Sequence, residues 1–386
     1  MKSVFEFLPE YGNKELKLAD GSVIGHLPKD PRMFVGYSTI YYGSTGSGKS
    51  TAILEQLHLI RNSVDRVVTF SPTNDVNMTY NTCQPLLTIH RNLTFEKIRD
   101  IFEQQKKIST FYAIINKMEI LEPIFHKMKS IPALNHQYYK AIAKIGAYRQ
   151  QYAEKMGRLR GQNLPFDVAK NQEAEYHGKL NDHIRNVYKN TIIEARHILL
   201  QNISDTTQIK ILQRINMNPN LLIIMDDCIE EIYQISKKHK TNSEDEFSMD
   251  TLFSKGRHFN ITIIIAAQDD NKVLPAIKKN TYISIFTEAE SANHFAESKS
   301  NAFTKEKKKK FQLAINAVFN SQTNTVNHKK LVYCMRGQGN NMFTYKIADV
   351  CRNFRVGSEE FWNKCLRAQN NFKPEDADRQ FIENFS

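Results

Sequence analysis

The sequence predicts an α/β fold, in which a mainly parallel sheet is flanked by helices and interrupted by a helical insertion. The first observation is a set of short segments rich in β-branched, aromatic or aliphatic residues, at 37–42, 65–70, 221–225, 260–267 and 281–286. Stretches with helical spacing separate them, and strands that alternate with helices form parallel sheets covered on both faces. The second observation is that strand signals disappear between residues 95 and 214, where helical spacing continues. The third is a glycine-rich octapeptide between the first predicted strand and a predicted helix.

The composition argues against a disordered chain and against a membrane-spanning one. Of the 386 residues, 41% are hydrophobic, which is enough for a large core and for two or three folding units. No apolar run is long enough to cross a bilayer, and Glu6 and Glu10 interrupt any apolar core of a signal peptide. The five cysteines are scattered without paired spacing, which is typical of reduced thiols. We therefore expect neither membrane insertion nor secretion.

Residues 43–50 read Gly-Ser-Thr-Gly-Ser-Gly-Lys-Ser and match the pattern G-x-x-x-x-G-K-[ST] in full. The glycines allow several backbone N–H groups to point into one concavity, where phosphate oxygens bind. Lys49 brings a mobile cation to the outer phosphates, and the Ser50 hydroxyl can complete the coordination of Mg²⁺. A predicted helix follows, so the phosphates would lie at its N-terminus. With ATP and Mg²⁺ as the expected cofactors, the predicted nucleotide contacts are Gly43, Ser44, Thr45, Gly46, Ser47, Gly48, Lys49, Ser50 and Thr51.

An acidic pair follows the apolar strand predicted at 221–225. A carboxylate at the end of a strand beside the phosphate-binding loop can hold Mg²⁺ through water, and the next one can polarise the attacking water. We assign Asp226 to the metal and Asp227 to the water. The alternative is that both acids cap the helix predicted at 229–237, since Asp is a favoured N-cap residue.

Two further polar side chains flank the strand predicted at 260–267. Gln268 follows this strand and can both donate and accept hydrogen bonds, so it could sense the γ-phosphate or orient water; the alternative is an ordinary polar loop residue. Arg257 precedes the strand and could act as an arginine finger on ATP held by a neighbouring subunit. The alternative is a structural ion pair with Glu230 or Glu231. The predicted catalytic residues are therefore Lys49, Asp227, Gln268 and Arg257.

The net charge of +12 and the isoelectric point near 9.2 favour a polyanionic partner. Residues 95–214 contain 20 Lys or Arg and 12 Asp or Glu, so this segment supplies eight of the twelve net charges. Lys305–Lys310 is a second basic cluster. In a chain with a phosphate-binding loop these clusters favour nucleic acid, although each alone could be a solvated helix face.

These patterns divide the chain into four parts. Residues 1–94 and 216–348 form the two halves of the nucleotide-binding domain, 95–215 the basic helical insertion and 349–386 a helical tail that contains Trp362. Segments 330–334 and 342–347 flank Gly337-Gln-Gly339 and predict a hairpin. The insertion is expected to fold as a separate unit around apolar residues such as Phe102, Ile114, Phe125, Tyr148 and Leu199.

Four elements together resemble one family, namely residues 43–51, 221–227, the phrase Ser254-Lys-Gly-Arg-His-Phe-Asn-Ile that leads into the following strand, and Gln268 at the end of that strand. They are similar to the poxvirus-type genome-packaging ATPases of large DNA viruses, within the FtsK–HerA superfamily of P-loop NTPases. The likeness covers about residues 34–95 and 216–300. The Asp-Asp pair departs from the Asp-Glu usual in the cellular pumps, and the likeness says nothing about the basic insertion.

The resemblance implies a P-loop NTPase fold of the additional-strand type, with an extra strand between those that bear the two Walker motifs. It also implies a homo-oligomeric ring, a pentamer or hexamer, that threads double-stranded DNA and works with capsid or portal proteins. Its location would be the viral assembly site in the host-cell cytoplasm, or the virion. We therefore hypothesise an ATP-driven motor that translocates viral double-stranded DNA into a capsid. The alternatives are a DNA helicase or remodelling ATPase, and a nucleotide-gated DNA-binding assembly scaffold with little turnover.

Overall fold

The computed structural model describes residues 15–162, 164–239, 247–268, 270–301, 303–319, 329–335 and 342–370. These residues form two compact units. Residues 107–217 make up the helical unit, and the other described residues make up the sheet unit.

The sheet unit is built on eight strands in the order β10-β9-β8-β3-β7-β6-β4-β5. Their bounds are β3 Ser38–Tyr42, β4 Arg66–Phe70, β5 Ile89–His90, β6 Leu221–Asp226, β7 Ile261–Ala267, β8 Ile283–Phe286, β9 Lys329–Cys334 and β10 Phe343–Ile347. The six strands from β8 to β5 are parallel, whereas β9 and β10 pair antiparallel at one edge. A separate two-stranded ribbon joins β1 (Leu16–Lys17) to β2 (Val23–Ile24).

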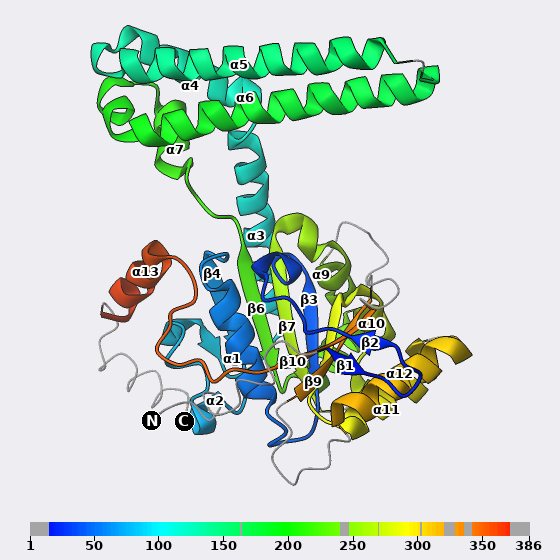
Figure 1. Ribbon diagram of the computed structural model, residues 1–386. Coiled ribbons are helices and arrows are strands. Elements are labelled where there is room, and N and C mark those ends of the chain that lie inside the picture. The colour runs from blue at the N-terminus through cyan, green and yellow to red at the C-terminus, as the bar shows by residue number, and fades with distance from the viewer. Residues whose placement is uncertain are drawn as a thin grey trace. The chain divides into compact units, whose positions relative to one another are not determined.

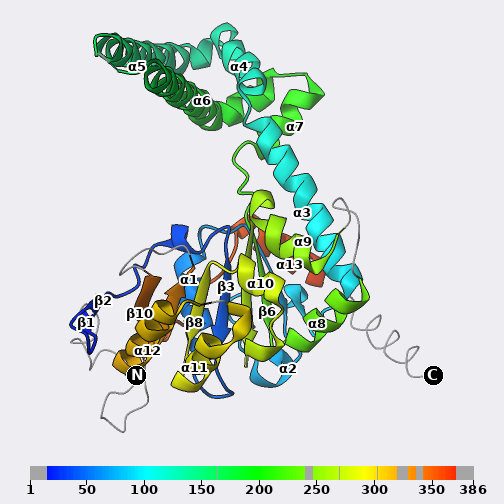
Figure 2. The ribbon, with the colours of Figure 1, turned by 90° about the vertical axis from the view of Figure 1, so that its right-hand side faces the viewer.

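Helices cover both faces of the sheet, which is why its central strands are continuous apolar runs. One face carries α1 (Lys49–Ile60) and α13 (Glu359–Asn370). The opposite face carries α8 (Ile229–Lys238), α9 (Met249–Lys255), α10 (Pro275–Asn280), α11 (Ala289–Glu297) and α12 (Lys305–Phe319), as Figures 1 and 2 show from two sides. Every residue of β6 and of β7 is buried between these layers.

The strand order confirms the predicted additional strand. β7 lies between β3, which precedes the glycine-rich loop, and β6, which ends in the acidic pair; Ile265 of β7 is paired with Ile40 on one side and with Met225 on the other. The predicted hairpin strands are also present, since β9 and β10 pair antiparallel. The residues predicted for their turn lie outside the described part of the chain.

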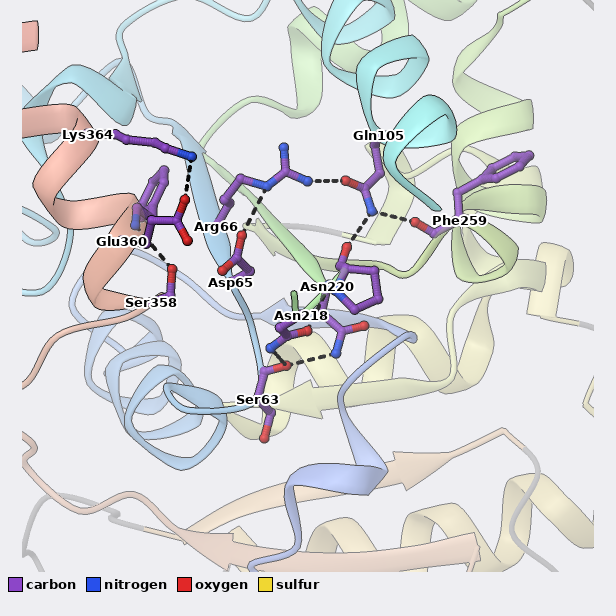
Figure 3. Close-up of polar contacts among 12 residues, drawn as sticks. Ser63, Asp65, Arg66, Gln105, Asn218, Asn220, Phe259, Ser358, Glu360 and Lys364 are labelled. Atoms are coloured by element: carbon purple, nitrogen blue, oxygen red, sulfur yellow. Dashed lines mark hydrogen bonds and ion pairs between the residues drawn. The ribbon is translucent and has the colours of Figure 1, made fainter. Parts of the chain in front are cut away.

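The first turns of α3 (Phe95–Ile115) pack in the sheet core, and the buried amide of Gln105 adds hydrogen bonds that anchor the helix there (Figure 3). Its Nε2 donates to the carbonyl oxygens of Pro219 and Phe259, at 2.7 and 2.6 Å, and its Oε1 accepts from Arg66. Leaving one buried polar group of this kind unpaired would cost about 1–3 kcal/mol. These bonds therefore specify where α3 docks, beside the starts of β4, β6 and β7.

The helical unit begins within α3 at residue 107, rather than at the predicted residue 95, because the earlier turns pack in the sheet core. It contains the end of α3 with α4 (Met118–Lys127), α5 (Asn135–Arg160), α6 (Phe166–Asn202) and α7 (Thr206–Arg214). Buried aromatic and aliphatic side chains form its own core, among them Phe125, Tyr138, Ile145, Tyr188 and Leu199. Two residues predicted for this core lie elsewhere: Phe102 packs in the sheet core, and Ile114 is 44% exposed.

The segment before α13 packs on the α1 face of the sheet. Val356 is fully buried there, and the N–H of Ser358 donates to the carbonyl oxygen of Asp65 at 2.8 Å. Gly357 has a φ of +94°, and a Cβ there would lie 2.8 Å from that same oxygen, so the close approach requires glycine. In the described parts of the chain, no helix combines the length and the apolarity needed to cross a bilayer.

Candidate nucleotide site

The glycine-rich loop leaves the end of β3 and enters α1. Gly43, Gly46 and Gly48 have φ values of 153°, 81° and 89°, in the region that favours glycine. A Cβ on Gly43 would lie 1.9 Å from Oγ1 of Thr287 and 2.6 Å from Oγ of Ser47, so any side chain at this position would have to displace both hydroxyls. Gly48 is the N-cap of α1, which leaves the first N–H groups of that helix free of intrahelical partners. The loop thus has the form of an anion cradle.

Lys49 lies across this loop. Its Nζ donates to the carbonyl oxygens of Gly43 and Ser44, at 2.5 and 2.8 Å. Burial lowers the pKa of Lys49, and nearby carboxylates, chiefly Asp226, oppose that shift. The ammonium group is therefore placed at the mouth of the loop, where the outer phosphates of a nucleotide would need a cation.

The end of β8 and the neighbouring strand β9 support the loop. The carboxylate of Glu288 accepts from the N–H and the hydroxyl of Ser44, at 2.6 and 2.7 Å. The hydroxyl of Ser47 bonds to the carbonyl of Ser44 and to Thr287 Oγ1, at 2.8 and 2.6 Å. Lys330 donates from β9 to the carbonyl of Ser47 at 2.9 Å, and burial lowers the pKa of Lys330 to about 8.

Asp226 ends β6 with a carboxylate that is only 8% exposed. The hydroxyl of the fully buried Tyr80 donates to its Oδ2 at 2.9 Å. Burial raises the pKa of Asp226, and the bond from Tyr80 works against that rise because it stabilises the ionised form. Tyr80 therefore favours the ionised form of this buried carboxylate, which is the form that a metal ion would bind.

Asp227 and Gln268 meet across the ends of two neighbouring strands. Asp227 is exposed, and its φ of 60° turns the chain sharply away from β6. Gln268 directly follows β7, and its Nε2 donates to Asp227 Oδ1 at 3.2 Å. The alternative N-cap role of the two acids is not observed, since Cys228 is the N-cap residue of α8 and makes no side-chain cap bond.

The donor set suits Mg²⁺, a hard cation that binds oxygen ligands. Ser50 lies in the first turn of α1, and Asp226 has one carboxylate oxygen held by Tyr80 and a second one for a metal-bound water. No cluster of three or more His, Cys, Asp or Glu side chains suited to a metal occurs among the described residues, so water and phosphate oxygens would complete the shell. Mg²⁺, when bound, would neutralise the charge of the outer phosphates.

Arg257 lies at the opposite ends of the parallel strands from the glycine-rich loop. It belongs to the 3₁₀ turn Gly256–Phe259 that precedes β7, whereas Gln268 follows the same strand. The seven residues of β7, at about 3.3 Å per residue, separate the two ends by roughly 20 Å. Arg257 is exposed and, within the described chain, forms no ion pair with Glu230 or Glu231. It therefore does not reach the loop of its own chain, and action in trans stays a prediction.

The site contains three residues that sequence reasoning did not identify, namely Tyr80, Glu288 and Lys330. Tyr80 follows β4 and Lys330 lies in β9, far along the chain from the motifs that they support. Of these three, only Glu288 could have been found from the sequence, because it follows a predicted strand and must therefore lie among the C-terminal ends of the parallel strands. Four predicted residues, Lys49, Asp226, Asp227 and Gln268, do lie there.

The loop geometry and the position of β7 between β3 and β6 decide the fold. The sheet unit has a P-loop NTPase fold of the additional-strand type. No family model matches the sequence. The chain is similar to a protein of African swine fever virus called uncharacterized protein B354L, at 23% identity over 364 residues, which cover 91% of this chain and 93% of that protein. B354L from a tick isolate of the same virus is 23% identical over 359 residues, covering 89% of this chain and 91% of that protein.

Among solved structures, the chain is similar to the genome packaging NTPase B204 from Sulfolobus turreted icosahedral virus 2 in complex with AMPPCP. The identity is 10%, the match covers 83% of this chain and 98% of that one, and the TM-score is 0.33. The bacterial conjugative coupling protein TrwB is 12% identical, with 92% of this chain and 93% of that one covered and a TM-score of 0.34. At such TM-scores these matches carry no argument, and the assignment of the fold rests on the loop geometry and the strand order.

Proposed function

We propose that this protein is an ATP-hydrolysing, ring-forming motor that moves viral double-stranded DNA into a capsid. The observation that carries the hydrolytic part is the convergence of Lys49, Asp226, Asp227 and Gln268 at one edge of the sheet, from the ends of β3, β6 and β7. A loop that only stored a nucleotide would not need the second acid and the glutamine beside it.

Each of these side chains has a separate task in the proposed reaction. Lys49 would move from the loop carbonyls to the outer phosphates, and Ser50 with Asp226 would hold Mg²⁺. Asp227 polarises the attacking water, and the amide of Gln268 fixes the direction of that carboxylate through their hydrogen bond. Because Gln268 directly follows β7, a change at the phosphates would be passed to the central strand of the sheet.

The DNA part of the proposal is supported by charge. The helical unit, residues 107–217, carries 17 Lys or Arg and 9 Asp or Glu, and the chain as a whole has a net charge of +12. Electrostatic binding of this kind attracts a polyanion without reading its sequence, as a translocating motor requires. The viral setting follows the resemblance of the motifs and the similarity to B354L of African swine fever virus. The site of action would then be the assembly site in the host-cell cytoplasm, or the virion, with capsid or portal proteins as partners.

Lys305–Lys310 is a weaker candidate for DNA contact than its sequence indicates. Lys307 donates to the hydroxyl of Tyr333 at 2.7 Å, and its ammonium lies 4.4 Å from the centre of the Phe303 ring. This lysine is thus part of the packing of α12 against β9. Lys308 and Lys309 are exposed and stay candidates for the DNA backbone.

Nucleotide turnover measured with different nucleic acids separates the motor from its alternatives. Duplex DNA should stimulate hydrolysis if the protein is a pump, and single strands should do so if it is a helicase or remodeller. A nucleotide-gated scaffold would respond to neither and would turn over slowly. The Lys49→Ala variant is the control for contaminating activity, because it removes the cation that the outer phosphates require. Stimulation by single strands alone would refute the packaging proposal.

The ring is tested by mixing two inactive variants. Arg257→Ala chains keep an intact P-loop, and Lys49→Ala chains keep an intact Arg257. If Arg257 acts on the ATP of its neighbour, some interfaces in a mixed ring regain both parts, and activity returns. An arginine finger contributes about 10³–10⁵ in rate, so even partial recovery is measurable. A mixed assembly as inactive as its two components would refute the trans role.

A further inference from the structure

We propose that one flank of α5 is a binding site for the phosphate backbone of duplex DNA. The first observation is a difference in charge between the two long helices of the helical unit. α5 contains six basic residues and one acidic residue, whereas α6 contains five of each. The charge of this helix pair is therefore concentrated on α5, with a net value of +5, and α6 is neutral.

The second observation is the difference in pairing between these helices. Ion pairs join Arg185 to Asp182 at 2.7 Å, Lys179 to Glu175, and Arg160 of α5 to Glu173 of α6 at 2.9 Å. Lys140, Lys144 and Arg158 of α5 are exposed, and within the described residues they form no ion pair. Two of the five basic side chains of α6 thus pair with acids of the same helix, whereas three of the six on α5, Lys140, Lys144 and Arg158, are exposed to a partner.

The available charges lie in a row. Lys140, Lys144, Lys155 and Arg158 are separated by four, eleven and three residues, which places them on one flank of a helix with 3.6 residues per turn. The row extends over about 27 Å at 1.5 Å per residue, close to the length of eight base pairs. The ammonium group of Lys155 lies 4.8 Å from the centre of the Tyr152 ring, which restricts that side chain. The helix backbone therefore fixes the spacing of these four basic residues before any partner binds.

The surroundings of the row favour duplex DNA over other polyanions. Proteins that bind single strands stack successive bases on several exposed aromatic rings. Of the tyrosines of α5, only Tyr139 is exposed, at 56%; Tyr138 and Tyr152 are buried, and Tyr148 is stacked on His183 at 4.7 Å within the helix pair. A membrane surface would require apolar side chains beside the charges, whereas the exposed residues along this flank include Ala147, Gln151 and one acid, Glu154. Fixed charges on a straight helix suit the regular phosphates of a duplex.

The identity of the polyanion rests on the proposed function, but the site is tested separately from hydrolysis. The full-length chain is titrated against a labelled DNA duplex without nucleotide, over a series of salt concentrations. One variant carries Lys140→Gln, Lys144→Gln and Arg158→Gln. The matched control removes the same charge from α6, with Lys170→Gln, Lys179→Gln and Arg185→Gln. Basal hydrolysis should stay unchanged in both, since none of these residues belongs to the nucleotide site.

The α5 variant should reduce the slope of log affinity against log salt by about 2.7, because each phosphate that is no longer neutralised lowers this slope by about 0.9. The α6 control should keep the parental slope. Equal reductions in both variants would mean that only net charge matters, and they would overturn the proposal. The proposal would also be overturned if the α5 variant lost binding to phosphatidylserine vesicles but kept the parental binding to DNA.

Two further measurements make the result decisive. Should the triple variant unfold on heating earlier than the parent, Lys144→Gln alone provides the test, with an expected reduction of about 0.9 in slope. Failure of the wild-type chain to hydrolyse ATP would refute the motor without affecting this site. Unchanged DNA binding by the α5 variant would refute the site without affecting the motor.

Discussion

Replacing Tyr80 with Phe tests whether one hydrogen bond tunes the proposed metal ligand. Tyr80 is fully buried, and its hydroxyl donates to Asp226 Oδ2 at 2.9 Å. Phe keeps the ring and removes only the hydroxyl. A hydrogen bond to a charged group contributes about 1.5–3 kcal/mol, which corresponds to roughly a tenfold to hundredfold change in an equilibrium.

The Tyr80→Phe variant should therefore need a magnesium concentration about ten to a hundred times higher for half-maximal hydrolysis, as is usual when a residue supporting a metal ligand is removed. The pH dependence gives a second readout. Burial raises the pKa of Asp226 and the Tyr80 bond opposes this, so the variant should have a still higher pKa. Because Mg²⁺ binds the ionised carboxylate, the acid limb of activity should move to higher pH.

The assay is a magnesium titration of nucleotide hydrolysis at several pH values. Tyr41→Phe is the matched control, because Tyr41 is also fully buried and its hydroxyl lies 2.7 Å from Gln56 Oε1 and 3.0 Å from the carbonyl oxygen of Ala52, away from the acids. Both variants should lose stability, but only Tyr80→Phe should change the magnesium requirement. An equal change in both, or an unchanged magnesium requirement in Tyr80→Phe, would refute the role assigned to Tyr80.

Three further outcomes are expected. Gly43→Ala should abolish nucleotide binding, since its Cβ would lie 1.9 Å from Thr287 Oγ1. Gly46→Ala should lower the free energy of unfolding in urea by only about 1–2 kcal/mol, because no atom lies within 4 Å of its Cβ. Asp227→Asn should bind nucleotide with the parental affinity and lower the turnover rate by at least about a hundredfold, as equilibrium binding and single-turnover measurements would reveal. Burial lowers the pKa of Lys330 to about 8, so the unfolded chain binds more protons than the folded one above that pH. Stability should consequently rise from about pH 8 towards pH 10, by at most about 1.4 kcal/mol per pH unit, relative to Lys330→Met.

The parts of the site that lie in local motifs could be predicted from the sequence, because the loop, the acidic pair and Gln268 each directly follow a strand. The supporting residues could not, since only the order of the strands in the sheet brings Tyr80 to Asp226 and Lys330 to the loop. The pattern around Arg257 predicts a catalytic role but does not say where the side chain lies. Because Arg257 precedes a parallel strand, it must lie at the N-terminal ends of the strands, opposite the loop. The predicted start of the insertion differs from the observed one because α3 is one continuous helix whose periodicity does not change at residue 107.

The central strand β7 has a mechanical consequence. At one end, Gln268 holds the carboxylate of Asp227; at the other, the carbonyl of Phe259 accepts from Gln105 of α3. Hydrogen bonds to β3 and β6 clamp the seven residues between these ends, so the strand can transmit a pull but can hardly stretch. A force applied at Gln105 would thus reach Asp227, the proposed water-polarising acid, through β7 and the two side-chain hydrogen bonds at its ends.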